Sequence, residues 1–131
     1  MTTRVLHWID GAAAEGGGRW GDVWNPATGA RQGQVALADA ATVDRAVQGA
    51  TRAIAGWRDP SLGRRAQVLF AFRDLVARNA EPLAACLTRE HGKVLSDARG
   101  EIARGLEVVE FACGLPELLK GSFSENVSHG V

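Results

Sequence analysis

The stretch HGKVLSDARGEIARGLEVVEF, residues 91–111, decides how the second half of the chain folds. Gly92 is typical of the residue that follows a helix end, whereas Ser96 and Asp97 favour the start of a new helix. Apolar residues then recur on one face at helical spacing: Ile102, Leu106, Val109 and Cys113. The stretch therefore predicts a turn and then an amphipathic helix, capped by Ser96, that runs to Gly114.

Three more helices are predicted before this one. The first begins at Asp39, which is a plausible N-cap. The second begins at Asp59-Pro60, with Asp as the cap and Pro at the first helical position. A shorter third helix runs from about Glu81 to Glu90. The expected apolar stripes are Val43, Ala46, Val47, Ala50, Ile54 and Trp57 in the first helix, and Val68, Leu69, Phe72, Leu75 and Val76 in the second.

The first third of the chain consists of short alternating segments separated by turn signals. AAAEGGG, residues 12–18, predicts a flexible turn, and NPATG, residues 25–29, predicts a tight turn with a positive φ at Gly29. We therefore expect an α/β fold: a short antiparallel β ribbon over about residues 6–37, followed by about four amphipathic helices over about residues 39–120. The last ten residues are polar and predict a strand or a linker.

Composition limits the classes of partner. The 131 residues are 46% hydrophobic and 23% charged, as in ordinary soluble domains, and 15 Lys+Arg balance 15 Asp+Glu. This neutrality predicts neither a nucleic-acid partner nor an anionic membrane partner. The sequence shows neither the apolar run of a membrane span nor a signal-peptide pattern, so we expect a cytoplasmic protein.

Most potential sites of chemistry in the sequence have a simpler structural interpretation. Cys86 and Cys113 lie within apolar helical patterns, so reduced core thiols are expected, and neither has the spacing of a metal site. GGGRWG, residues 16–21, matches the GxGxxG string of dinucleotide sites. Such sites need a helix directly after the glycines, whereas an alternating strand follows here, so a hairpin turn is predicted.

Arg104 has two possible roles. Glu101 and Glu107 lie three residues to either side, so periodicity alone favours a salt-bridge ladder on the helix surface. The alternative is that Arg104 binds the carboxylate of a substrate, because its planar guanidinium can donate two parallel hydrogen bonds. Gly105 beside it leaves room for a ligand to approach.

Several of these motifs together resemble the aldehyde dehydrogenase superfamily. WNPATG, the following strand, RRAQVLFAFRDLV and LTREHGK resemble its N-terminal portion. The string EHGKVLSDARGEIARGLEVVEFACGLPELLKGSFSENV resembles its CoA-acylating, methylmalonate-semialdehyde branch. The resemblance covers about residues 6–131 and implies that residues 1–131 form the N-terminal portion of an NAD-binding domain.

The resemblance also implies a reaction. In this branch a cysteine thiolate attacks an aldehyde, hydride passes to NAD, and the acyl group is transferred to CoA. Methylmalonate semialdehyde loses carbon dioxide and gives propionyl-CoA, a step of valine catabolism, whereas malonate semialdehyde gives acetyl-CoA. The branch further implies that Arg104 lines the substrate tunnel and binds the substrate carboxylate, and that the enzyme is a dimer or tetramer.

The sequence departs from the family in what it lacks. Cys86 and Cys113 match no catalytic motif, and the cofactor-binding segment and nucleophilic cysteine of the family have no counterpart here. We therefore expect a segment that is inactive alone, binds neither NAD nor CoA alone, and has the remainder of a dehydrogenase chain as its partner. The alternative is a non-catalytic helical interaction module, or a degenerate paralogue.

Overall fold

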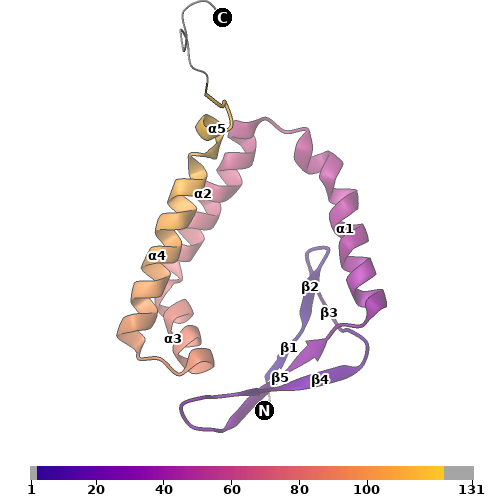
Figure 1. Cartoon of the computed structure of the whole chain (residues 1–131), viewed down its shortest axis with the longest axis vertical. Helices are drawn as coiled ribbons and strands as arrows, with labels where there is room; N and C mark the ends of the chain where they lie inside the picture. Colours follow the sequence, from indigo (N-terminus) through magenta and orange to yellow (C-terminus); the bar gives the residue numbers. More distant parts are fainter. Residues whose placement is uncertain (1–2, 123–131) are drawn as a thin grey trace, which may run out of the picture.

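The computed structural model describes residues 3–122 of the chain, in which strands come first and helices follow (Figure 1). The strands are β1 (Thr3–Val5), β2 (His7–Ile9), β3 (Ala12–Ala14), β4 (Arg19–Trp24) and β5 (Arg31–Leu37). The helices are α1 (Ala40–Arg58), α2 (Leu62–Arg78), α3 (Ala80–His91), α4 (Leu95–Cys113) and α5 (Leu115–Leu118). This order confirms the predicted α/β class. The strand or linker predicted for the last ten residues falls almost wholly on residues 123–131, outside the described part.

The NPATG segment forms the predicted tight turn between β4 and β5. The amide of Gly29 donates to the carbonyl of Asn25 at 2.8 Å, and the amide of Ala27 donates to the Asn25 side-chain oxygen at 2.9 Å. Gly29 has a φ of 70°, which a glycine adopts without strain. The turn therefore makes β4 and β5 an antiparallel hairpin.

The strand arrangement is richer than a single antiparallel ribbon. β1 pairs in parallel with β5, with Thr3 opposite Gly33, so that β5 is the central strand of a three-stranded sheet. β2 and β3 form a separate antiparallel pair. The prediction of a flexible turn over residues 12–18 is wrong at Ala12–Ala14, because these alanines pair with His7–Ile9 as β3.

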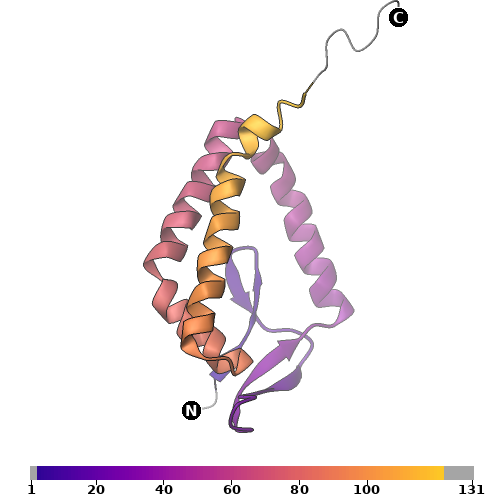
Figure 2. The same cartoon turned by 60° about the vertical axis from the view of Figure 1, so that its left-hand side comes forward.

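The helices are divided between two places (Figures 1 and 2). α4 packs against α2 and α3, and the short α5 packs on the end of α2. α1 stands away from this group in both views and contacts β2 instead. Within the described residues the chain is therefore a helical bundle joined to a small sheet by one long helix that lacks a neighbour along much of its length.

Two of the predicted helix starts are confirmed and two are wrong. Asp39 caps α1, and α3 begins at Ala80, next to the predicted Glu81. α2 begins at Leu62 with Ser61 as its cap, because α1 runs to Arg58 and Asp59 is its C-cap, with its amide donating to the carbonyl of Ala55. α4 begins at Leu95, so Ser96 lies inside the helix and makes no cap.

The buried residues are small. They are Gly33, Ala36, Thr42, Gly49, Ala66, Ala84, Ala98 and Cys113. The α4 stripe is confirmed, with Cys113 buried and its other members partly covered. In contrast, much of the predicted stripes of α1 and α2 is exposed, because no described element covers them. The prediction of two core thiols is wrong for Cys86, which is exposed near the end of α3. No helix in residues 3–122 is long and apolar enough to cross a membrane.

Candidate functional site

Arg104 projects from α4 on the side opposite the buried stripe and is exposed. Among the described residues, no hydrogen bond or ion pair joins its guanidinium to another side chain, and Glu101 and Glu107 are not bonded to it. The salt-bridge ladder that periodicity favoured is therefore not formed. This leaves a fixed positive charge available for a ligand.

Glu101 is bonded to a different cation. The Nζ of Lys93, in the turn before α4, donates to Oε1 of Glu101. The Lys93 side chain is 16% exposed, whereas that of Glu101 is 50% exposed. The hydrogen bond from Lys93 lowers the pKa of Glu101 below its usual value, and the positive charges of Lys93 and Arg104 add to this effect. Glu101 is therefore ionised and lies near Arg104, but its carboxylate is bonded to Lys93.

The turn that carries Lys93 rests on the NPATG turn. Gly92 ends α3 in the left-handed conformation with a φ of 83°, and its amide donates to the carbonyl of Thr88 at 2.8 Å. A Cβ at this position would lie 3.0 Å from Cγ of Pro26 and 3.3 Å from the amide nitrogen of Ala27. The turn at Gly92 therefore lies directly against the NPATG turn, and this contact fixes the backbone position of Lys93.

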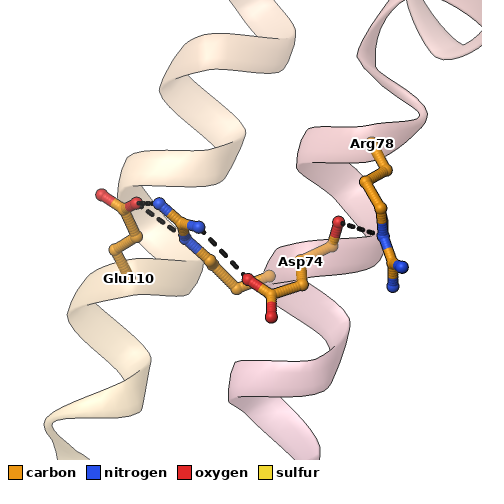
Figure 3. A network of polar contacts seen from close by, with 4 residues as sticks. Asp74, Arg78 and Glu110 are labelled. Atoms are coloured by element: carbon orange, nitrogen blue, oxygen red, sulfur yellow. Dashed lines mark hydrogen bonds and ion pairs between the residues drawn. The ribbon is translucent and has the colours of Figure 1, made fainter.

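Two arginine–carboxylate pairs join α4 to its neighbouring helices. Arg99 donates to both oxygens of Glu81 in α3, at 2.8 and 2.9 Å. Arg73 in α2 donates twice to Oε1 of Glu110, at 3.0 and 2.7 Å, and also bonds Asp74 (Figure 3). The bonds to Glu110 and Asp74 raise the pKa of Arg73, and the bond to Glu81 raises that of Arg99. One pair lies near each end of α4.

The surface around Arg104 is open and combines glycines and exposed apolar side chains with the carboxylates of Glu101 and Glu107. Gly100 and Gly105 have nothing within 4 Å of where a Cβ would stand. Val108 and Phe111, one and two turns further along, are 68% and 69% exposed. Helical spacing places Gly100, Arg104, Val108 and Phe111 on one side of α4. A cation beside exposed apolar groups can bind a small ligand that has a carboxylate at one end and little charge elsewhere.

The glycine string at residues 16–21 does not fit a pyrophosphate. It joins β3 to β4 and no helix follows, so no helix N-terminus faces it. A Cβ at Gly17 would lie 2.5 Å from the Asp39 carboxylate, which is an anion and would repel a phosphate. Within residues 3–122, no three His, Cys, Asp or Glu side chains are grouped as metal ligands.

Lys93 is the residue of this site that the sequence did not single out. Its signal was present, because Lys93 follows the glycine that ends one helix and precedes the helix that carries Glu101. Pairs eight residues apart have no fixed geometry until the turn between them is known, so the spacing alone predicted no contact.

Comparisons with known proteins show which family the fold and sequence resemble. Residues 12–130 match the model of the aldehyde dehydrogenase family. The chain is 42% identical over 95% of its length to a malonate-semialdehyde dehydrogenase of Pseudomonas aeruginosa, of which it covers 25%. It is similar to the crystal structure of methylmalonate-semialdehyde dehydrogenase from Oceanimonas doudoroffii, with a TM-score of 0.88, 43% identity and coverage of 99% of this chain and 26% of that one.

A Sinorhizobium meliloti structure in complex with NAD is similarly related, with a TM-score of 0.89, 44% identity, and coverage of 99% of this chain and 27% of that one. The chain thus spans about a quarter of the length of the proteins that it matches, and its fold is that of the N-terminal part of their fold. Strand order, helix order and the match over residues 12–130 lead to one conclusion: the chain belongs to the aldehyde dehydrogenase family.

Proposed function

We propose that this chain is the N-terminal quarter of an NAD-dependent, CoA-acylating methylmalonate- or malonate-semialdehyde dehydrogenase. In this proposal residues 1–131 form the first part of the NAD-binding domain. The remaining three quarters supply the nucleophilic cysteine, the cofactor-binding segment and the transfer to CoA. The complete enzyme is a cytoplasmic homo-oligomer. The similarity to semialdehyde dehydrogenases over almost the whole chain supports the proposal.

Arg104 is the residue that binds the substrate carboxylate in this proposal. The observation that carries it is an exposed guanidinium that makes no ion pair among the described residues, on a side of α4 with open glycines and exposed apolar groups. A semialdehyde of this class carries a carboxylate at one end and an aldehyde at the other. Two charge-assisted hydrogen bonds to the carboxylate would orient the aldehyde toward the rest of the enzyme.

The first experiment is to sequence the source DNA beyond the codon for Val131. An open frame that continues into a catalytic domain with a cysteine nucleophile supports the proposal and provides the complete enzyme for kinetics. A stop codon directly after Val131 contradicts a single-chain enzyme. The segment would then be joined to the remaining three quarters of the Pseudomonas aeruginosa relative, and an inactive, folded hybrid would contradict the proposal altogether.

The substitution Arg104→Leu tests the substrate in the active enzyme. We expect the KM for malonate semialdehyde to rise on the order of tenfold to a hundredfold, because hydrogen bonds to a charged group are lost. Propionaldehyde has nearly the same shape but no carboxylate, so its KM should change less than about twofold. NADH formation, followed by absorbance, gives both values.

Two control variants accompany it. Arg104→Lys keeps the charge but loses the planar pair of donors, so it should fall between the parent and Arg104→Leu. Arg99→Leu removes an arginine of the same helix that is bonded to Glu81 and should leave the preference for the carboxylate intact. Equal effects of Arg104→Leu on both aldehydes would refute the assigned role.

A further inference from the structure

Glu101 lies within reach of two cations but binds only one. It is three residues before Arg104 on α4, at a spacing that brings side chains together on a helix surface. Its carboxylate nevertheless accepts from Lys93, and Arg104 is left without a partner among the described residues. The charge of Arg104 still helps to lower the pKa of Glu101, so the two groups interact at a distance.

The alternative pairing would block the candidate site. A carboxylate that accepts from Arg104 would occupy the same donors that a substrate carboxylate needs. Since Glu101 belongs to the same helix, it would compete at a high effective concentration and would never diffuse away. A free Glu101 would therefore act as an internal inhibitor of carboxylate binding.

Lys93 has the advantage in this competition. Its side chain is mostly covered, at 16% exposure, and its backbone is fixed by Gly92 against Pro26. An ion pair that is partly shielded from water is stronger than one in open solvent, and a side chain already held in place loses less entropy when it pairs. Among the described residues Arg104 is exposed, so solvent would screen its pairing with Glu101 more than it screens the pairing with Lys93.

We propose that Lys93 is a positioning residue that holds Glu101 away from Arg104 and thereby keeps the Arg104 guanidinium free to bind the substrate carboxylate. This inference rests on the proposed function of Arg104. It assigns Lys93 no contact with substrate and no part in the chemical step. Its effect is on the affinity for aldehydes that carry a carboxylate.

The test compares Lys93→Met with the double variant Lys93→Met/Glu101→Gln in the complete enzyme. We expect Lys93→Met to raise the KM for malonate semialdehyde about fivefold, as a competing surface ion pair would, with kcat unchanged. The KM for propionaldehyde should stay within about twofold. Removing the competing carboxylate as well should return the KM for malonate semialdehyde to within about twofold of the parent value.

The double variant separates positioning from a purely structural role. If the Lys93–Glu101 pair only stabilised the turn, removing both partners would be as harmful as removing one, and the KM would stay high. That result would overturn the inference, as would an unchanged KM in a folded Lys93→Met enzyme. Lys93→Gln provides a second comparison if the Met variant does not accumulate as folded protein, and the same outcomes decide.

The two sets of variants distinguish the role of Lys93 from the role of Arg104. If Arg104→Leu selectively raises the KM for malonate semialdehyde but Lys93→Met does not, Arg104 binds the carboxylate and Lys93 has no positioning role. If Arg104→Leu affects both aldehydes equally, the assigned role of Arg104 is wrong and Lys93 has nothing to keep free.

Discussion

Gly92 combines two requirements that other residue types do not meet together. Its φ of 83° lies in the left-handed region, and a Cβ there would approach Cγ of Pro26 to 3.0 Å. The sequence predicted the first requirement, since glycine commonly follows a helix end, but it did not predict the second. Contacts between turns that are distant in sequence depend on how whole elements pack, so the spacing of residues along the chain does not predict them.

The substitution Gly92→Ala should destabilise the folded chain by about 1–3 kcal/mol, the usual cost of a residue held in a sparsely populated backbone conformation. The midpoint of thermal unfolding, compared between the variant and its parent in the complete enzyme, checks the direction of this change. Gly56→Ala is the matched control: Gly56 lies inside α1, and no atom lies within 4 Å of the position that a Cβ would take. That change should stabilise by about 0.5–1 kcal/mol. Equal effects of the two substitutions would show that the turn at Gly92 is unimportant.

Arg104 and Lys93 show where sequence reasoning about the site ends. Both roles of Arg104 could be stated from the sequence, because its neighbours three residues away are fixed by helix geometry. Whether Glu101 pairs with Arg104 depends on the position of Lys93, which the turn before α4 sets, and substrate binding by Arg104 stays a prediction. The sequence therefore identified Arg104 and the glutamates that share its helix, but it did not identify Lys93.

At the scale of elements, the helices were predicted well and their starts less well. Apolar periodicity identified α1 to α4, but Asp59-Pro60 and Ser96 were wrong as starts of α2 and α4. A residue that could cap one helix can instead end the helix before it, and Asp59 is the C-cap of α1. The parallel partner of β5 was missed because pairing between β1 and β5 spans about 30 residues and leaves no local signal.

The N-cap of α1 gives a testable pH dependence. The hydroxyl and the amide of Thr42 donate to Oδ1 of Asp39 at 2.6 and 2.8 Å, and these bonds lower the pKa of Asp39 below its usual value of 3.8. A carboxyl group with a lowered pKa in the folded state contributes stability above its unfolded pKa. That contribution is lost as the pH falls through the lowered value.

We therefore expect the NMR signal of the Thr42 amide to titrate with a midpoint below 3.8, in step with a loss of order in the first turn of α1. In Asp39→Asn, which keeps a side-chain cap but no ionisable group, the Thr42 signal should not show this transition. A midpoint at or above the usual value would mean that the cap seen here does not form in solution.

At the scale of the whole molecule, the described part has little interior. Its buried apolar residues are alanines and one cysteine, and no large side chain is fully buried. The faces of α1 and α2 that periodicity predicted as core are half exposed. The helical periodicity predicts which apolar residues share one face of a helix. It does not predict whether the element that covers this face lies within the same 131 residues.

The isolated chain should consequently unfold over a broad range of temperature and bind a hydrophobic dye before it is heated, because its apolar faces lack partners. Differential scanning calorimetry and dye fluorescence measure these two properties. A single sharp transition without dye binding would instead favour the alternative of an independent interaction module. Joining the segment to the remainder of a dehydrogenase should abolish dye binding and sharpen the transition.

The isolation of α1 has a consequence for the protein in a living cell. Val43, Val47, Ile54 and Trp57 are the kind of exposed apolar surface that chaperones and quality-control proteases recognise. During synthesis these residues leave the ribosome well before any segment that follows Val131. The amount of protein that accumulates therefore depends on how soon α1 is covered, and a substitution that delays its covering lowers abundance even where it leaves Arg104 untouched.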